Sequence, residues 1–159
     1  MIFPKNGRIF PHLKPQPDVG AYLDVEVSAI GGNTPGDKHS ITFALGNTTL
    51  PEDEWLCMGV TYDSKTIGAY VNGVLDVRKR THHFQAGVEE VWENPYDMAE
   101  TYKGAPGGVY SGNGTFAVGG KAGTIVKNQR HGLPGLYHGL ALYNVALTMD
   151  EMTDVCKGN

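Results

Sequence analysis

The residues with the clearest chemical potential lie between His82 and Tyr110, where aromatic rings are interspersed with carboxylates and amides. A flat ring can stack on a ligand, and an acid or amide beside it can hydrogen-bond to that ligand. The alternative is that these aromatics hold a loop against the body of the domain, since loop aromatics often serve packing. The candidate binding residues are Trp92, Tyr96, Tyr102, Tyr110, Glu93, Asn94 and Asp97.

Other residue types offer little catalytic or metal chemistry, so we predict no catalytic residues. His82 and His83 are adjacent, and neighbouring side chains on a strand point to opposite faces, which makes shared metal ligation awkward. Cys57 and Cys156 form no CxxC pair, which argues against a zinc knuckle or a redox dithiol. Two buried free thiols are the favoured interpretation, and a single long-range disulfide is the alternative for a secreted protein.

The stretch from Trp55 to Leu75 predicts the scaffold that must position these residues. The Asp63-Ser64-Lys65 turn and the Asn72-Gly73 pair divide it into an antiparallel meander of three strands. Asn-Gly is typical of a type I′ turn, in which both central residues take positive φ. Apolar residues alternate along both longer strands, so we expect one core face and one more exposed face, and a third strand from Val74 to about Lys79.

The remaining segments predict further strands and one helix. Prolines at 4, 11, 15 and 17 favour an irregular lead-in over residues 1–18, and residues 81–113 read as one long loop. Thr148 and Glu151 have the spacing of a capping box, which predicts a short C-terminal helix. Strands are expected at 21–30, 40–45, 115–119 and 135–144. The predicted core residues are Val60, Ile41, Phe43, Val71, Val118, Leu140 and Leu142. On strand 21–30, Leu23, Val25 and Val27 should face inward, while the other face carries Tyr22, Asp24, Glu26 and Ser28.

Composition limits the classes of protein. A chain of 159 residues fits a single domain, and 22 Gly with 9 Pro favour strands and turns over helices. The net charge of −4 gives no reason to expect a nucleic-acid partner. No apolar run reaches the ~20 residues of a membrane span, and the first residues lack a signal-peptide pattern. We therefore expect no membrane insertion, while composition leaves the oligomeric state open.

Several short motifs occur in an order that resembles a known fold family. These are Trp55, Val60-Thr-Tyr-Asp63, Tyr70-Val-Asn-Gly73, Phe116-Ala-Val-Gly119, Gly139-Leu-Ala-Leu-Tyr-Asn144 and Ala146-Leu-Thr148. In series they resemble a concanavalin A-like jelly roll of the laminin-G-like group, over roughly residues 40 to 156. The resemblance implies an all-β fold of two packed antiparallel sheets, with Trp55 in the core. Such domains usually begin with further upstream strands, so this one is either abbreviated or part of a longer polypeptide.

The resemblance also implies activities. Carbohydrate binding is the commonest, and it would use the aromatic and polar residues of the 82–110 stretch, with a glycan or glycoprotein as partner. Many relatives bind calcium, for which the scattered candidates are Asp24, Asp37, Asp63 and Asp97. An extracellular or surface location is implied as well. The glucanase motif Glu-x-Asp-x-x-Glu is absent from the sequence. Alginate lyases of this fold carry a Tyr-Lys-Ala-Gly segment, and Tyr102-Lys-Gly-Ala105 has the same residues in a different order.

Three hypotheses of function follow. The first is a non-catalytic carbohydrate-binding or adhesive lectin-like module. The second is a structural or interaction domain of a larger surface or virion protein. A glycoside hydrolase or polysaccharide lyase comes third, because two carboxyl groups must flank one glycosidic bond and no motif here supplies them. If the first hypothesis holds, the ring of Trp92 should line an accessible groove with Tyr96 or Tyr102.

Overall fold

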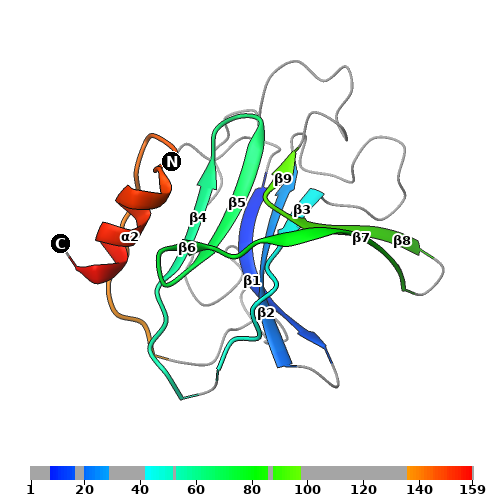
Figure 1. Cartoon of the computed structure of the whole chain (residues 1–159), viewed down its shortest axis with the longest axis horizontal. Coiled ribbons are helices and arrows are strands. Elements are labelled where there is room, and N and C mark those ends of the chain that lie inside the picture. Colours follow the sequence, from blue (N-terminus) through cyan, green and yellow to red (C-terminus); the bar gives the residue numbers. More distant parts are fainter. Residues whose placement is uncertain are drawn as a thin grey trace, which may run out of the picture.

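A computed structural model describes residues 8–16, 20–28, 42–51, 53–85, 88–97 and 136–158. Within these ranges the chain is mostly antiparallel β-structure with one C-terminal helix, which confirms the predicted all-β class (Figure 1). The strands form three sheets, ordered β1-β2-β3, β4-β5-β6 with β9 also on β5, and β7-β8.

The first sheet contains the two strands predicted around residues 21–30 and 40–45. β2 (Gly20–Ser28) pairs antiparallel with β3 (Thr42–Leu45), with Val25 opposite Ala44. The predicted irregular lead-in is wrong for part of its length, because β1 (Arg8–Gln16) pairs with β2 throughout. Prolines are tolerated there because β1 lies at the edge of the sheet, where a missing N–H need not interrupt the ladder.

The central meander is confirmed. β4 (Met58–Tyr62) pairs with β5 (Thr66–Val71), which in turn pairs with β6 (Val74–Leu75). Asn72 and Gly73 have φ angles of 51° and 82°, as a type I′ turn requires. The third strand is shorter than predicted, because the chain leaves β6 after Leu75.

The chain from 78 to 97 is more regular than the predicted long loop. β7 (Arg78–Gln85) and β8 (Val88–Asn94) form a hairpin, and β9 (Tyr96–Asp97) returns to pair with β5. Charged and polar residues along β7 hid the strand from a search for apolar alternation. The rest of the predicted loop, from residue 98 to 113, lies outside the described residues.

The main core joins the first sheet to the meander. It contains Leu23, Val25, Ala44, Leu50, Ile67, Ala69 and Tyr96, with Leu56, Val60, Tyr62, Val71 and Val91 partly buried against it. The inward prediction for Leu23 and Val25 is confirmed, and that for Val60 and Val71 holds in part. Ile41, Val118 and the side chain of Phe43 lie outside the described part of the chain.

A second cluster covers the opposite face of β2 and β3. Leu45 and Trp92 are buried there, with Tyr22 packed against them. Asp24 lies on the same face as Tyr22 and is only 1% exposed, so its predicted place on a solvent face is wrong. Asp24 is buried because the β7-β8 hairpin places Trp92 over this face of β2. The alternation of apolar and polar residues along β2 predicts that the same face is polar and exposed.

Helix α2 (Met149–Lys157) begins with the predicted capping box. The backbone N–H of Thr148 donates to Glu151 Oε2 at 2.8 Å, and the Glu151 N–H donates to Thr148 Oγ1 at 3.3 Å. The Thr148 backbone N–H, assisted by its hydroxyl, lowers the pKa of Glu151 below its ordinary value of 4.5. Gly158 ends the helix in the left-handed region with φ of 78°.

The helix packs on the face of the meander that was expected to be more exposed (Figure 1). Met152 is buried against β4 at Gly59, where any added Cβ would collide with its sulfur. A Cβ on Gly73 would lie 2.6 Å from the Thr153 Cα. Both glycines therefore allow α2 to approach the meander closely, and Gly73 also allows the turn geometry.

Two predictions for the C-terminal third are wrong. Residues 136–143 form no strand within the described chain, and Leu140 and Leu142 are 63% and 50% exposed instead of buried. Trp55, expected in the core, is 67% exposed, because it precedes β4 and does not enter the sheet.

Candidate functional site

The predicted binding residues fall on β8 and β9. Trp92, Glu93 and Asn94 end β8, and Tyr96 and Asp97 form β9. Tyr102 and Tyr110 lie outside the described residues. The five described candidates therefore lie on two strands that are consecutive in the chain but belong to different sheets. Whether each could bind a ligand depends on what its side chain already contacts.

Trp92 is 3% exposed. It packs against Leu45, and the guanidinium of Arg78 lies 5.6 Å from its ring centroid and 5.0 Å from that of Tyr22. Arg78 Nε also donates to the Gly46 carbonyl at 2.7 Å, which fixes the cation between the rings. The described residues therefore form no accessible groove beside Trp92. Its ring instead anchors the β7-β8 hairpin to the first sheet.

Asn94 is fully buried, and its amide is occupied by the protein. Oδ1 accepts from the Ala69 N–H at 2.9 Å, while Nδ2 donates to the Ala69 carbonyl at 2.9 Å and to the Asp76 carbonyl at 2.5 Å. Tyr96 is 5% exposed and belongs to the main core. Neither side chain is placed to contact a sugar hydroxyl.

Glu93 and Asp97 are half-buried, and so more accessible than the buried candidates Trp92, Asn94 and Tyr96. Arg80 clamps Glu93 with two hydrogen bonds, from Nε to Oε2 at 2.7 Å and from Nη2 to Oε1 at 2.8 Å. Asp97 is half-buried opposite Thr66 on β5. Two acids without an exposed aromatic beside them in the described structure do not make a stacking site for a sugar ring.

Asp76 is a structural residue that the sequence analysis did not single out. Its carboxylate accepts from the N–H groups of Asn47 and Thr48 at 2.9 and 3.0 Å, and from Thr48 Oγ1 at 2.7 Å. Gly46 has no side chain to block this approach, because any Cβ there would collide with the Asp76 carboxylate. The contacts tie the end of β3 to the end of the meander.

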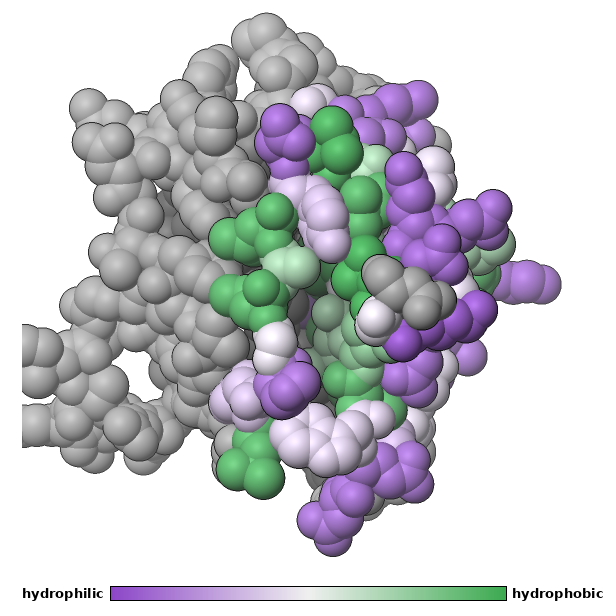
Figure 2. Space-filling model, turned by 90° about the vertical axis from the view of Figure 1, so that its left-hand side faces the viewer, coloured by the Kyte–Doolittle hydropathy of each residue, from purple (hydrophilic) through white to green (hydrophobic). Residues whose placement is uncertain are grey.

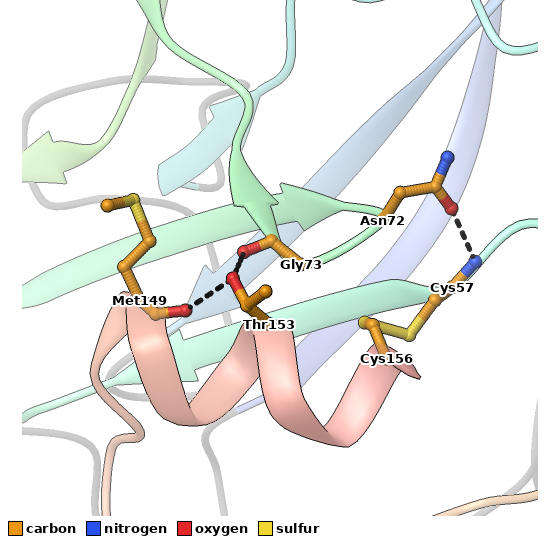
Figure 3. The surroundings of a disulfide bond; sticks show 6 residues. All are labelled: Cys57, Asn72, Gly73, Met149, Thr153 and Cys156. Carbon is orange, nitrogen blue, oxygen red and sulfur yellow. Dashed lines mark hydrogen bonds between the residues drawn. A yellow bond between two sulfur atoms is a disulfide. The ribbon is translucent and has the colours of Figure 1, made fainter. Parts of the chain in front are cut away.

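A disulfide joins Cys57 to Cys156, so the interpretation of two free thiols is wrong and the alternative holds (Figure 3). The two Cα atoms are 5.5 Å apart across a sequence separation of 99. The Cys57 N–H donates to Asn72 Oδ1 at 3.0 Å, and Thr153 Oγ1 lies 3.0 Å from the Gly73 carbonyl. The bond and these contacts fix α2 to the start of β4 and to the Asn-Gly turn.

Large apolar side chains are exposed on the side of the molecule that carries α2 (Figure 2). The Trp55 ring lies edge-on to that of His138, with centroids 6.3 Å apart. The segment 136–148, orange in Figure 1, leads along this side into the helix. We call these residues the α2-side apolar surface: Trp55, Leu136, Tyr137, Leu140, Leu142, Tyr143, Val145 and Met149, which are 41% to 84% exposed.

The calcium candidates are separated by their structural roles. Asp24 is buried in the first sheet, and Asp37 lies outside the described residues. Asp63 Oδ1 accepts from the N–H groups of Lys65 and Thr66. Asp side chains in turns often form such hydrogen bonds to the backbone that follows them. Among the residues whose positions are described, no group of three or more His, Cys, Asp or Glu could hold a metal ion.

No family model and no curated protein matches the chain. One solved structure is similar, an S-layer domain-containing protein (residues 221–444) from Clostridium thermocellum ATCC 27405, at 14% identity and a TM-score of 0.41. The match covers 95% of this chain and 63% of that one.

In the described ranges no helix is both long and apolar enough to cross a bilayer.

Proposed function

We propose that this chain is a non-catalytic interaction domain of a larger surface or virion protein, and that it binds through the α2-side apolar surface. The proposal rests on one observation, that the residues predicted to bind a ligand are buried while residues predicted to be in the core are exposed. The predicted ligand residues Trp92, Asn94 and Tyr96 are buried, while Trp55 and Leu140 are exposed. Clustered exposed apolar side chains are typical of interaction sites.

The disulfide supports a location outside the reducing cytosol. Disulfides persist in secreted and surface proteins and are rare where thiols are kept reduced. The Cys57–Cys156 bond closes most of the chain and holds α2 in place. The implied laminin-G-like jelly roll belongs to the same proposal, and the Asn72-Gly73 meander and the capped terminal helix are the features that support it.

Site-specific photo-crosslinking tests the proposed surface. A benzophenone amino acid would replace Trp55 in one preparation and Lys65, exposed in the β4-β5 turn, in a matched control. The chain is kept in its parent polypeptide for this experiment. The proposal predicts many crosslinked protein adducts from the benzophenone at position 55 and few from that at position 65. Equal labelling at both positions, or none at position 55, would contradict it.

One observation favours carbohydrate binding as a second candidate. Trp55 presents an exposed ring beside His138, and the exposed acids Asp53 and Glu54 precede it. A rigid aromatic with neighbouring acceptors is what sugar stacking needs. Asp53 also has a positive φ of 59°, a strained conformation that clusters at functional sites.

A glycan array with and without calcium separates the two candidates. If Trp55 is a sugar platform, a bound glycan should be lost in Trp55→Ala and retained in Glu93→Gln. The interaction-domain proposal predicts no glycan whose binding depends on Trp55.

A further inference from the structure

The turn that follows β3 carries a motif for N-linked glycosylation. Asn47-Thr48-Thr49 has the form Asn-x-Ser/Thr, in which x is any residue except proline. The chain has one other such motif, Asn113-Gly114-Thr115, which lies outside the described residues. Motifs this short also occur by chance, so the surroundings of Asn47 decide whether its side chain can carry a glycan.

The structure presents this motif at the surface. Leu45 and Leu50, which flank the turn, are buried in the core, whereas Asn47, Thr48 and Thr49 are all exposed. An N-linked glycan is bulky and hydrophilic, so a folded domain tolerates it only on an exposed side chain. Asn47 meets this requirement.

The hydrogen bonds that hold the turn in place use its backbone. The Gly46 N–H donates to the Leu23 carbonyl at 2.8 Å. The N–H groups of Asn47 and Thr48 donate to the Asp76 carboxylate at 2.9 and 3.0 Å. A sugar attached to Asn47 Nδ2 breaks none of these bonds, so the folded turn and a glycan on it are compatible.

The Cys57–Cys156 disulfide is a second, independent observation. Disulfides form and persist in secretory and extracellular compartments, and N-linked glycosylation belongs to secreted proteins as well. The bond and the motif therefore indicate the same route of synthesis.

We propose that Asn47 is a site of N-linked glycosylation, with a lipid-linked oligosaccharide as the co-substrate. The bond from Asn47 Nδ2 to the anomeric carbon of the first sugar forms as the bond from that carbon to the diphosphate oxygen breaks. The polyprenyl diphosphate leaves with the electron pair and Nδ2 loses one proton, so nothing is oxidised or reduced. Thr49 supplies the hydroxyl that the motif requires two residues after the asparagine. None of these residues belongs to the α2-side apolar surface.

Mass spectrometry of protein secreted by cultured eukaryotic cells tests the proposal. The full chain is produced with a signal peptide, and an amidase then releases the glycans in heavy-oxygen water, which converts each glycosylated asparagine to a labelled aspartate. The protein is reduced and digested with trypsin. Asn47 is the only asparagine of tryptic peptide 39–65, and Asn113 is the only one of peptide 104–121, so the two motifs are read separately. We expect most copies of peptide 39–65 to carry the label.

Two substitutions at Thr49 separate the motif from other effects. Thr49→Ala should abolish the label on peptide 39–65, while Thr49→Ser, which keeps a hydroxyl, should retain it. Asn47→Gln keeps the backbone N–H that donates to Asp76, so it should lose the glycan and melt as the deglycosylated wild type does. Asn144→Gln changes an exposed asparagine outside either motif, and its peptide 39–65 should be labelled as in the wild type.

A secreted wild type whose peptide 39–65 is unlabelled would overturn the proposal. A label on that peptide that survives Thr49→Ala would overturn it as well. Either result leaves the proposed function standing, because crosslinking from position 55 tests a different part of the surface.

Discussion

The side-chain amide of Asn94 pairs with the backbone of Ala69 as a neighbouring strand would. Oδ1 accepts from the Ala69 N–H and Nδ2 donates to its carbonyl, each at 2.9 Å. β6 pairs with Tyr70 and Val71 and β9 with Thr66 and Ile67, so Asn94 fills the gap between two short strands on β5. A residue predicted to bind a ligand is thus part of a sheet.

Replacing Asn94 should therefore cost stability. Asn94→Ala leaves the backbone groups of Ala69 buried without these partners, and we expect a loss of roughly 2–4 kcal/mol in the free energy of unfolding, measured by urea denaturation. Asn47→Ala is the control, because Asp76 binds the backbone N–H of Asn47 and not its side chain. Wild-type stability in Asn94→Ala would refute this role.

Truncating the two tryptophans should change the free energy of unfolding by very different amounts. Trp92→Ala removes a side chain that is 3% exposed and packed on Leu45, so a loss of about 3–5 kcal/mol is expected. Trp55→Ala should change stability by about 0.5 kcal/mol or less, as exposed positions usually do. Thermal and chemical unfolding followed by circular dichroism measures both. A larger loss in Trp55→Ala than in Trp92→Ala would reverse the assignment.

Reducing the Cys57–Cys156 bond should destabilise the fold. With a sequence separation of 99, the loop-entropy model gives an upper value of about 4–5 kcal/mol. We expect the melting temperature of the wild type to fall when a thiol reductant is added. The Cys57→Ser/Cys156→Ser variant should melt low in both conditions, and a wild type indifferent to reductant would show that the bond does not contribute.

The capping box predicts a pH dependence. The pKa of Glu151 is lowered in the folded state by the Thr148 N–H and hydroxyl, so folding favours the ionised carboxylate. Its contribution is present above the ordinary value of 4.5 and is lost as pH falls through the lowered pKa. The melting-temperature difference between wild type and Glu151→Gln should therefore shrink in acid. Glu54→Gln, an exposed acid outside the helix, is the control.

Local rules predicted the elements whose information is contiguous in the sequence. Asn72-Gly73 specifies its turn through backbone φ, and Thr148 with Glu151 specifies a helix start through two reciprocal hydrogen bonds. Alternation placed Leu23 and Val25 correctly, because a half-buried strand has a period of two. These features depend on few residues and little on the rest of the fold.

Long-range relationships decided the rest. Leu45 is buried, yet it packs against Trp92 instead of the main core, since a hairpin far along the chain covers the second face of β3. The aromatic, amide and acid pattern around Trp92 is the same for a ligand site and for a packed strand end, so residue types alone could not distinguish them. Two cysteines likewise say nothing of their distance in space, which the folded chain sets at 5.5 Å between Cα atoms.

Collisional quenching of the two tryptophans most directly tests the claim that the α2-side apolar surface, and not the Trp92 region, is available to a partner. Trp92→Phe leaves Trp55 as the only tryptophan, and Trp55→Phe leaves Trp92. At a concentration where the protein is monomeric, acrylamide should quench the Trp55 emission strongly and the Trp92 emission weakly, in line with their 67% and 3% exposure. A readily quenched Trp92 beside a protected Trp55 would contradict the account and restore the 92–97 residues as the binding site.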